Sequence, residues 1–467
     1  MSTRVSAGTA RGASEADWQA LEKAVAGRVL RPGAAGFRAS SAPFNQRFAA
    51  TTPSGVLSVA DTADVRRALD WSRTTGVPLV ARGGGHSYAG YSVNTGLVLD
   101  LSALNTVSAD GATGLVTAAG GARMSDVYAA IQPHEMAFAL GNGASVGIAG
   151  LALGGGSSST SRKLGLTADA LVRTTLMTAD GQVLTCDAQE NTDLYWACRG
   201  GGGGNFGISL SFTFQACPVS DVSTCLLLWD GADAPEVFPV MQEIARKAPD
   251  EFSLRLGVSA AGGPDATVSA VGLHLGPASE LRELLAPALE ATRPVREDFA
   301  DRTFWEAKDY LLHETSAGAF AARTRFATEP LPAEAVATVL SWLERRPGSG
   351  NPDGCGLALY TWGGAINRVA PADTAFVHRD AQFLVSMDTS WAEHDSPWTA
   401  EANLRWLAGL REAVAPYVGE GSYQNFIDPD LPDWRTAYYG ANYPRLVEIK
   451  KRVDPDGFFA FGQGIGS

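Results

Sequence analysis

A histidine directly follows three glycines at the end of a segment with β-strand character, where residues 79–88 read LVARGGGHSY. Because glycine has no Cβ, the backbone N–H groups of such a turn can converge on an anion such as a pyrophosphate. His86 would then lie beside whatever the phosphates carry. A tight turn with a structural histidine explains this motif alone equally well.

A second glycine cluster contains a serine in a GxSxG pattern. Residues 141–150 read GNGASVGIAG, which places Ser145 where a serine hydrolase has its nucleophile. A nucleophile elbow needs a strand before it and a helix after it. The residues that follow are apolar and rich in glycine, so we expect no helix there. A loop packed against a flat ligand is favoured, and a serine hydrolase that uses Ser145 is a remote alternative.

A third cluster, residues 199–207, reads RGGGGGNFG and formally satisfies GxGxxG. A Rossmann fingerprint must follow a strand and open a helix. Here a helix-like segment at 192–198 comes first, and a strand from Ile208 follows. The motif is therefore not of the Rossmann type. Several glycine loops within one β-rich region favour an extended dinucleotide laid along them.

The composition sets limits on the class of protein. The chain has 467 residues, 52 of them glycine, with 45% hydrophobic and 19% charged residues, which is enough for a large core and excludes wholesale disorder. A net charge of −13 without a basic stripe argues against a nucleic-acid partner. No apolar run reaches the roughly 18 residues that a membrane span needs. The first residues contain no apolar export segment, so we expect a cytoplasmic protein.

The five cysteines show neither a CxxC pair nor a metal-binding spacing, so we expect no metal site. Cys217 and Cys225 could bridge a short loop. Reduced cysteines in a cytoplasmic protein are the favoured alternative.

The periodicity of apolar residues predicts an α+β chain with two regions that differ in glycine content and in the length of their elements. Before residue 218, short strands alternate with glycine turns, a hairpin turns at 179–181, and helices are expected at 14–26 and 62–74. After Pro218, glycine becomes rarer and the segments lengthen, as in an α+β domain with a broad sheet backed by helices. The helices expected there are 234–247, 278–291, 332–346 and 400–416, and the strands are 252–258, 267–275 and 355–361.

Four motifs in order resemble the berberine-bridge-enzyme-like FAD-linked oxidases: RGGGHSYAG, LGGGSSSTSRKLGL, WACRGGGGGNFGI, and YYGANYPRL with DPDGFF and GQGI. The resemblance runs from about residue 40 to the C-terminus. It implies a two-part FAD-binding domain of the vanillyl-alcohol-oxidase type plus a substrate domain with a broad antiparallel sheet backed by helices. The implied domains are 1–218 (core about 45–216) for FAD, 219–422 for substrate, and 423–467 returning to the FAD domain.

The resemblance also implies that His86 is bonded to the 8α-methyl group of the flavin. Many relatives attach FAD a second time through a cysteine, but Gly143 stands at that position, so we expect a single covalent bond. The other implied FAD-contacting residues are Arg82, Gly83, Gly84, Gly85, Ser87, Tyr88, Gly143, Ser145, Val146, Gly147, Gly150, Gly154, Gly155, Gly204, Asn205, Gly207, Ile208, Tyr439, Asn442 and Tyr443.

For catalysis, the resemblance points to two tyrosines, Tyr423 and Tyr360. A phenol with a pKa near 10 is a poor base at neutral pH, so a nearby positive charge or a donated hydrogen bond must assist it. Ordinary core aromatics with satisfied hydroxyl groups are the alternative. Ala149 and Ile148 depart from residues that lie near the flavin in relatives, and Ile148 occupies a position that influences oxygen access there.

The expected function is therefore oxidation of an alcohol or hemiacetal carbon, on a sugar or a secondary metabolite, by hydride transfer to flavin N5 with a tyrosine base. The partners would be a small-molecule substrate and an electron acceptor, with O₂ as a candidate. A monomer or a homodimer is expected. Oxidative cyclisation of a natural product and a non-catalytic flavin-binding protein are the alternatives.

Overall fold

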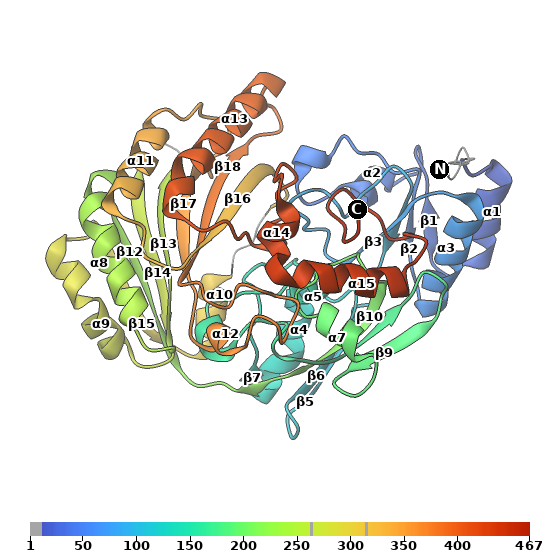
Figure 1. The fold of residues 1–467 in the computed structure, drawn as a ribbon, viewed down its shortest axis with the longest axis horizontal. Helices are drawn as coiled ribbons and strands as arrows, with labels where there is room; N and C mark the ends of the chain where they lie inside the picture. Colours follow the sequence, from blue (N-terminus) through green and yellow to red (C-terminus); the bar gives the residue numbers. More distant parts are fainter. Residues whose placement is uncertain (1–11, 262–264, 313–315) are drawn as a thin grey trace.

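The computed structural model describes residues 12–261, 265–312 and 316–467, and it forms two halves side by side (Figure 1). The N-terminal half holds a four-stranded sheet in the order β1-β2-β4-β3 and a five-stranded antiparallel sheet in the order β5-β6-β10-β8-β9. The four strands of the first sheet are β1 (Arg28–Leu30), β2 (Gly55–Ser58), β3 (Leu79–Arg82) and β4 (Leu97–Asp100). The second sheet consists of β5 (Val107–Asp110), β6 (Leu115–Ala119), β8 (Leu171–Met177), β9 (Val183–Asp187) and β10 (Ile208–Gln215). A short ladder joins β7 (Met136–Ala137) to β11 (Cys217–Pro218).

Short helices connect the strands of this half. They are α1 (Glu15–Ala24), α2 (Phe37–Ser41), α3 (Thr62–Thr75), α4 (Met124–Ile131), α5 (Ile148–Leu153), α6 (Ser161–Leu164) and α7 (Thr192–Ala197). The first has a complete capping box, in which Ser14 and Asp17 each accept from the other's backbone N–H. Local sequence thus fixes where this helix begins.

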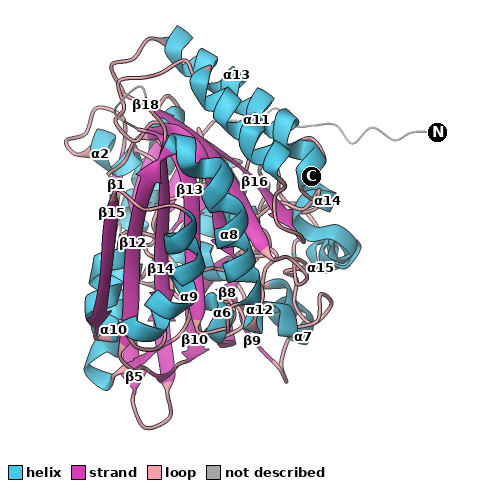
Figure 2. Cartoon of the chain, turned by 90° about the vertical axis from the view of Figure 1, so that its left-hand side faces the viewer, coloured by secondary structure: helices cyan, strands magenta, loops and turns pink. Residues whose placement is uncertain are grey.

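The other half is built on a seven-stranded antiparallel sheet in the order β15-β12-β14-β13-β17-β18-β16. Helices α8, α9, α11 and α13 cover one face of it (Figure 2). The strands are β12 (Val222–Asp230), β13 (Phe252–Ala260), β14 (Thr267–His274), β15 (Arg296–Arg302), β16 (Ala319–Ala327), β17 (Cys355–Thr361) and β18 (Phe383–Trp391). The helices are α8 (Ala234–Lys247), α9 (Ala278–Ala291), α10 (Phe304–Leu311), α11 (Ala333–Glu344), α12 (Ala365–Arg368) and α13 (Pro397–Val414).

Side chains alternate in direction along each strand of the large sheet. One set points into the core under the helices, and the other set forms a second face on the opposite side of the sheet. On β13, Leu254 and Leu256 are buried in the core beneath the helices, whereas Arg255 between them points the other way. The antiparallel register places Arg255 opposite Tyr360 of β17 and Val271 of β14. This second face turns toward the N-terminal half.

The C-terminal segment crosses back to the N-terminal half, as Figure 1 shows in red. It contains α14 (Trp434–Tyr439) and α15 (Tyr443–Val453), whose apolar residues join the same core cluster as the five-stranded sheet. Lys450 is buried there, where it pairs with Asp454 and donates to the carbonyls of Asn205 and Phe459. These bonds tie the segment to the third glycine cluster.

The structure confirms the α+β class, the hairpin at 179–181 and the helices and strands expected after residue 218, with boundary shifts of a few residues. One expectation is wrong. A helix, α5, does follow the GxSxG pattern directly, because Ile148, Ala152 and Leu153 are buried on one side of it. Cys217 and Cys225 are both free. Within the described residues, no helix has the length and apolarity that crossing a membrane requires.

A buried ion pair joins the two halves. Arg379 donates to both carboxylate oxygens of Asp169 at 2.8 Å, and the two side chains are 0% and 9% exposed. We expect Arg379→Met to lower the free energy of unfolding by about 3–5 kcal/mol, because it leaves a buried carboxylate without its partner. Urea unfolding measures the effect.

The matched control is Arg405→Met, which breaks an exposed pair with Glu401. That change should cost at most about 1 kcal/mol. Equal losses in the two variants would show that the bridge between the halves contributes no more than a surface pair.

Candidate active site

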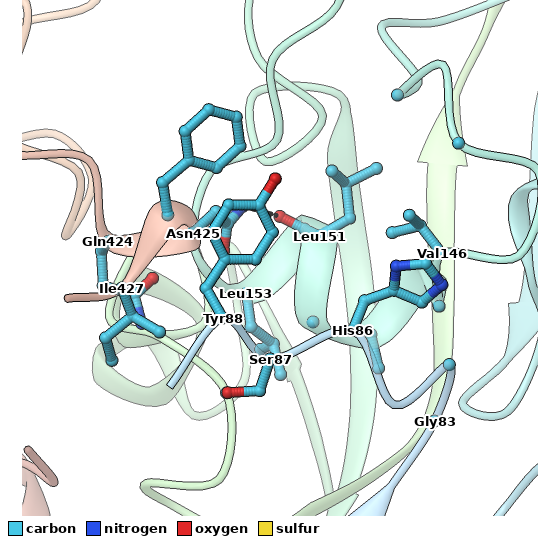
Figure 3. Close-up of a pocket in the computed structure, with 18 of the residues that line it drawn as sticks. Gly83, His86, Ser87, Tyr88, Val146, Leu151, Leu153, Gln424, Asn425 and Ile427 are labelled. Atoms are coloured by element: carbon cyan, nitrogen blue, oxygen red, sulfur yellow. Dashed lines mark hydrogen bonds between the residues drawn. The ribbon is translucent and has the colours of Figure 1, made fainter. Parts of the chain in front are cut away.

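A cavity of about 720 Å³ lies between the two halves, within the roughly 300–1,000 Å³ usual for small-molecule and cofactor sites. Its walls come from three parts of the chain. The glycine clusters form one side, the second face of the large sheet forms another, and the C-terminal segment from Tyr423 to Phe461 closes it. Figure 3 shows the segment from Gly83 to Tyr88 beside Gln424 and Asn425 of the C-terminal segment.

The glycines of the wall fall into two kinds. Gly84 and Gly147 pack backbone against backbone, so that a Cβ on either residue would overlap the other loop. Gly150 and Gly203 instead border the cavity, and a Cβ on either would meet nothing closer than 3.9 Å. The first kind brings the two loops together, and the second leaves room for a flat ligand against the backbone.

His86 lies between a ring and a hydroxyl group. Its imidazole stacks on Phe44 with ring centroids 3.7 Å apart, and its Nε2 lies 2.9 Å from Ser145 Oγ. Burial, with the charge of Arg123 as a second cause, lowers the pKa of His86 to about 4. The imidazole is therefore neutral at physiological pH and available as a nucleophile.

Arg82 presents a buried donor at the cavity wall. Its Nη2 bonds to Asp100 at 2.8 Å and to the carbonyl of Ser40, while Nη1 has no partner within the described residues. An unpartnered buried donor is costly unless a ligand satisfies it. A phosphate or a hydroxyl group of a ligand in the cavity would do so.

Tyr423 borders the cavity but is held tightly. It is only 1% exposed, and its Oη accepts from the backbone N–H of Gly156 at 3.0 Å and from Asn425 Nδ2 at 3.2 Å. Burial raises the pKa of Tyr423, and bonds from Asn425, Ser157 and Gly156 oppose that rise. Both lone pairs of this oxygen are thus already in use.

Tyr360 lies on the sheet beside a cation. Arg255 Nε donates to Tyr360 Oη at 3.4 Å, and the guanidinium carbon lies 5.8 Å from the centre of the phenol ring. The negative charge that Tyr360 can carry is the first cause of a raised pKa of Arg255. Phe426 packs edge-on against Tyr360 and stacks on Tyr88, so all three rings border one end of the cavity.

The structure brings most of the predicted site residues to the cavity wall. In addition to both tyrosines, these are Arg82, Gly83, Gly84, Gly85, His86, Ser87, Tyr88, Gly143, Val146, Gly147, Gly150, Gly204, Gly207 and Ile208. Ser145 reaches the wall only through its bond to His86. Ala149 borders the cavity, whereas Ile148 is fully buried away from it.

Six predicted residues do not border the cavity: Gly154, Gly155, Asn205, Tyr439, Asn442 and Tyr443. Asn205 accepts from the backbone of Ile465, and Tyr439 donates to the carbonyl of Gly201. These bonds fix the third glycine cluster against the C-terminal segment.

Several wall residues were not predicted from the sequence, foremost Phe44, Arg255 and Trp362. The sequence does contain a pattern that could have identified Arg255 as a residue outside the core. The run FSLRLGV on β13 alternates polar and apolar residues, which marks a strand with one face outside the core. Within the described residues no group of three or more His, Cys, Asp or Glu side chains could hold a metal ion.

Two family models match the chain: an FAD binding domain over residues 53–187, and "Berberine and berberine like" over residues 422–466. An uncharacterized FAD-linked oxidoreductase of Bacillus subtilis is 35% identical over 86% of this chain and 88% of its own. The chain belongs to the berberine bridge enzyme-like family of FAD-linked oxidoreductases.

Other members of this family agree in sequence and fold. A chitooligosaccharide oxidase of Gibberella zeae is 28% identical over 88% of this chain and 87% of its own. The solved structure of berberine bridge enzyme-like 1 from Physcomitrella patens superposes with a TM-score of 0.88, at 28% identity, over 96% of this chain and 98% of that one.

FAD is the cofactor of this berberine bridge enzyme-like protein, and the cavity fits it. The free spaces above Gly150 and Gly203 suit a flat ring system, and the unpartnered Nη1 of Arg82 suits a phosphate or ribose oxygen. Among the described residues, the cavity wall contains two arginines and no carboxylate side chain, which suits a dinucleotide with negative charge.

Gly150 allows this fit to be tested without the reaction. We expect Gly150→Val to fold normally but to retain less than about a tenth of the wild-type FAD, because its side chain enters space that nothing else fills. The ratio of flavin to protein absorbance measures retention. Ala20→Val, an exposed change on α1, is the control. Full flavin content in Gly150→Val would mean that FAD does not lie against this residue.

Proposed function

We propose that this protein oxidises an alcohol or hemiacetal carbon of a sugar or secondary metabolite, with a single covalent FAD bond through His86 and a tyrosine as the base. The observation that carries the proposal is that His86 and the Tyr360–Arg255 pair border the same cavity. One group can hold a flavin, and the other can take a proton from a substrate hydroxyl.

The role of His86 rests on its protonation state. FAD, when bound, accepts the hydride of the substrate C–H bond. Because the pKa of His86 is lowered to about 4, its imidazole carries a free electron pair at neutral pH. Phe44 and Ser145 hold the ring in one orientation. Gly143 supplies no second nucleophile, which supports a single attachment.

Of the two tyrosines, Tyr360 is the better placed to receive a proton. A phenol acts as a base only where its surroundings favour the phenolate, and a guanidinium in contact does so. Tyr360 has such a partner in Arg255. Within the described residues Tyr423 has no cation in contact, and its oxygen already accepts two hydrogen bonds. We therefore assign the base to Tyr360, and to Tyr423 the positioning of the turn at Gly156.

The aromatic lining supports a ring-shaped substrate. Tyr88, Trp362 and Phe426 border the cavity together with Tyr360. The C–H faces of a sugar ring are apolar and pack on aromatic rings, while its hydroxyl groups need polar neighbours such as Ser253 and Asn425. The name of the related chitooligosaccharide oxidase agrees with a sugar.

The linkage can be tested by acid precipitation. Wild-type protein should keep its yellow colour in the pellet, and His86→Ala should release it to the supernatant, because the only attachment point is gone. Flavin absorbance of both fractions gives the result. Flavin retained in the His86→Ala pellet would place the bond elsewhere, and a colourless wild-type preparation would contradict the redox function.

The lowered pKa of His86 has its own consequence for attachment. When apoprotein from riboflavin-starved cells is mixed with FAD, the rate of covalent bond formation should change by less than about twofold between pH 7.5 and 5.5. An imidazole with the ordinary pKa of 6.5 would be about 90% protonated at pH 5.5, and the rate would drop about tenfold. Denaturing gel fluorescence follows the bond. A tenfold fall would show that His86 titrates normally.

The base can be tested by rapid mixing with a substrate under anaerobic conditions. Tyr360→Phe should slow flavin reduction by about 10²–10⁴-fold, because it removes general-base assistance. Tyr423→Phe loses only a hydrogen-bonded support and should slow it less. The reverse order of the two effects would transfer the role of base to Tyr423.

A further inference from the structure

Arg255 is a guanidinium at the cavity wall without an ion-pair partner. It is half-buried, and within the described residues its only hydrogen bond is the long one from Nε to Tyr360. Its Nη1 and Nη2 have no partner there, and they are not enclosed by protein. The other arginine of the wall, Arg82, is paired with Asp100.

Among the described residues, no carboxylate forms an ion pair with Arg255. The residues around it on the wall are Ser253, Val271, Leu273, Leu311 and Tyr360, none of them a carboxylate. Asp388 acts on Arg255 electrostatically, but within the described residues no ion pair joins the two side chains. In the sheet, Asp388 is opposite Gly356, whereas Tyr360 is opposite Leu384, four residues away along the strand.

A partly buried, unpaired guanidinium is costly unless a ligand completes it. The Nη1–Nη2 edge of arginine matches the two oxygens of a carboxylate, because both groups are planar and bidentate. A phosphate carries more charge than one guanidinium balances, and among the described residues no second cation lies on this side of the cavity wall. A neutral alcohol would leave the edge without a charged partner.

We propose that the substrate carries a carboxylate, and that the Nη1–Nη2 edge of Arg255 binds it while Nε stays on Tyr360. The proposal rests on the proposed function, because it uses the same cavity. It narrows the substrate class to hydroxy acids such as uronic-acid sugars or hydroxyalkyl aromatic acids. Arg255 thus selects the substrate by charge and holds it close to the phenol that takes the proton.

Matched pairs of acid and amide test the charge directly. D-Glucuronate is compared with D-glucuronamide, and 4-(hydroxymethyl)benzoate with 4-(hydroxymethyl)benzamide, since each pair differs chiefly in charge. Dissociation constants are measured on the holoenzyme from the change in flavin absorbance and from tryptophan fluorescence. In at least one pair the acid should bind at least about tenfold more tightly than the amide, a typical effect of a charge-assisted hydrogen bond.

Variants then assign the preference to Arg255. In Arg255→Gln the ratio of the two dissociation constants should fall to about one, and Arg255→Lys should keep part of it. Val271→Glu should also abolish the preference, because it places a carboxylate opposite Arg255 in the sheet. Val271→Gln and Arg296→Gln should keep it, the latter because Arg296 is exposed on β15 outside the cavity wall.

The ratio of binding constants separates this proposal from the proposed function. If Arg255 acted only by assisting proton transfer, Arg255→Gln would slow flavin reduction for acid and amide alike and would leave the ratio of their dissociation constants at the wild-type value. If neither pair shows a preference for the acid, or if the preference survives in Arg255→Gln, the proposal is wrong. Flavin reduction by neutral alcohols would then still support the proposed function. Preferred binding of the acids without any flavin reduction would support the carboxylate site and contradict the oxidation.

Discussion

The register of the seven-stranded sheet is the constraint on which the site depends. Side chains alternate between faces with a period of two, so a slip of one residue would exchange the two sets. The helices α8, α9, α11 and α13 demand an apolar face, and this demand fixes Leu254 and Leu256 inward. As a result, the side chains of Arg255 and Tyr360 must point to the opposite face, toward the cavity. The packing of the helices on the core face of the sheet thus determines which side chains point into the cavity on the opposite face.

The cavity also depends on backbone contacts that side chains would prevent. Gly84 and Gly147 bring two loops together, and Asn205, Tyr439 and Lys450 hold the third glycine cluster from behind. The buried pair of Arg379 and Asp169 adds a fixed link between the halves. The part of the wall formed by the glycine clusters is therefore rigid, as a match to the cofactor requires. The side chains that differ in chemistry are supplied by the face of the large sheet.

Much of this could be predicted from the sequence, and the failures have physical reasons. The helix at 278–291 was predicted to the residue, because its buried residues Leu281, Leu285 and Ala288 lie on one side at helical spacing. The strand at 355–361 was also predicted to the residue, as a short apolar run that is buried on both faces over most of its length. Helix α5 was missed, since glycine disfavours helices in isolation and only tertiary burial of Ile148 stabilises this one. The motifs predicted His86 and Tyr360 as site residues, and both border the cavity. They could not show that Tyr439 bonds to Gly201 or that Asn442 bonds to Thr374, because both bonds join segments that are far apart in the sequence.

The three-part wall has a consequence for how the protein is made. Residues 423–461 supply one side of the cavity, and Arg255 and Tyr360 of the large sheet supply another. Translation must therefore pass residue 461 before the pocket exists, however early the first glycine cluster folds. Completion of the cavity therefore requires that residues 423–461 dock onto the two parts of the wall that are made before them.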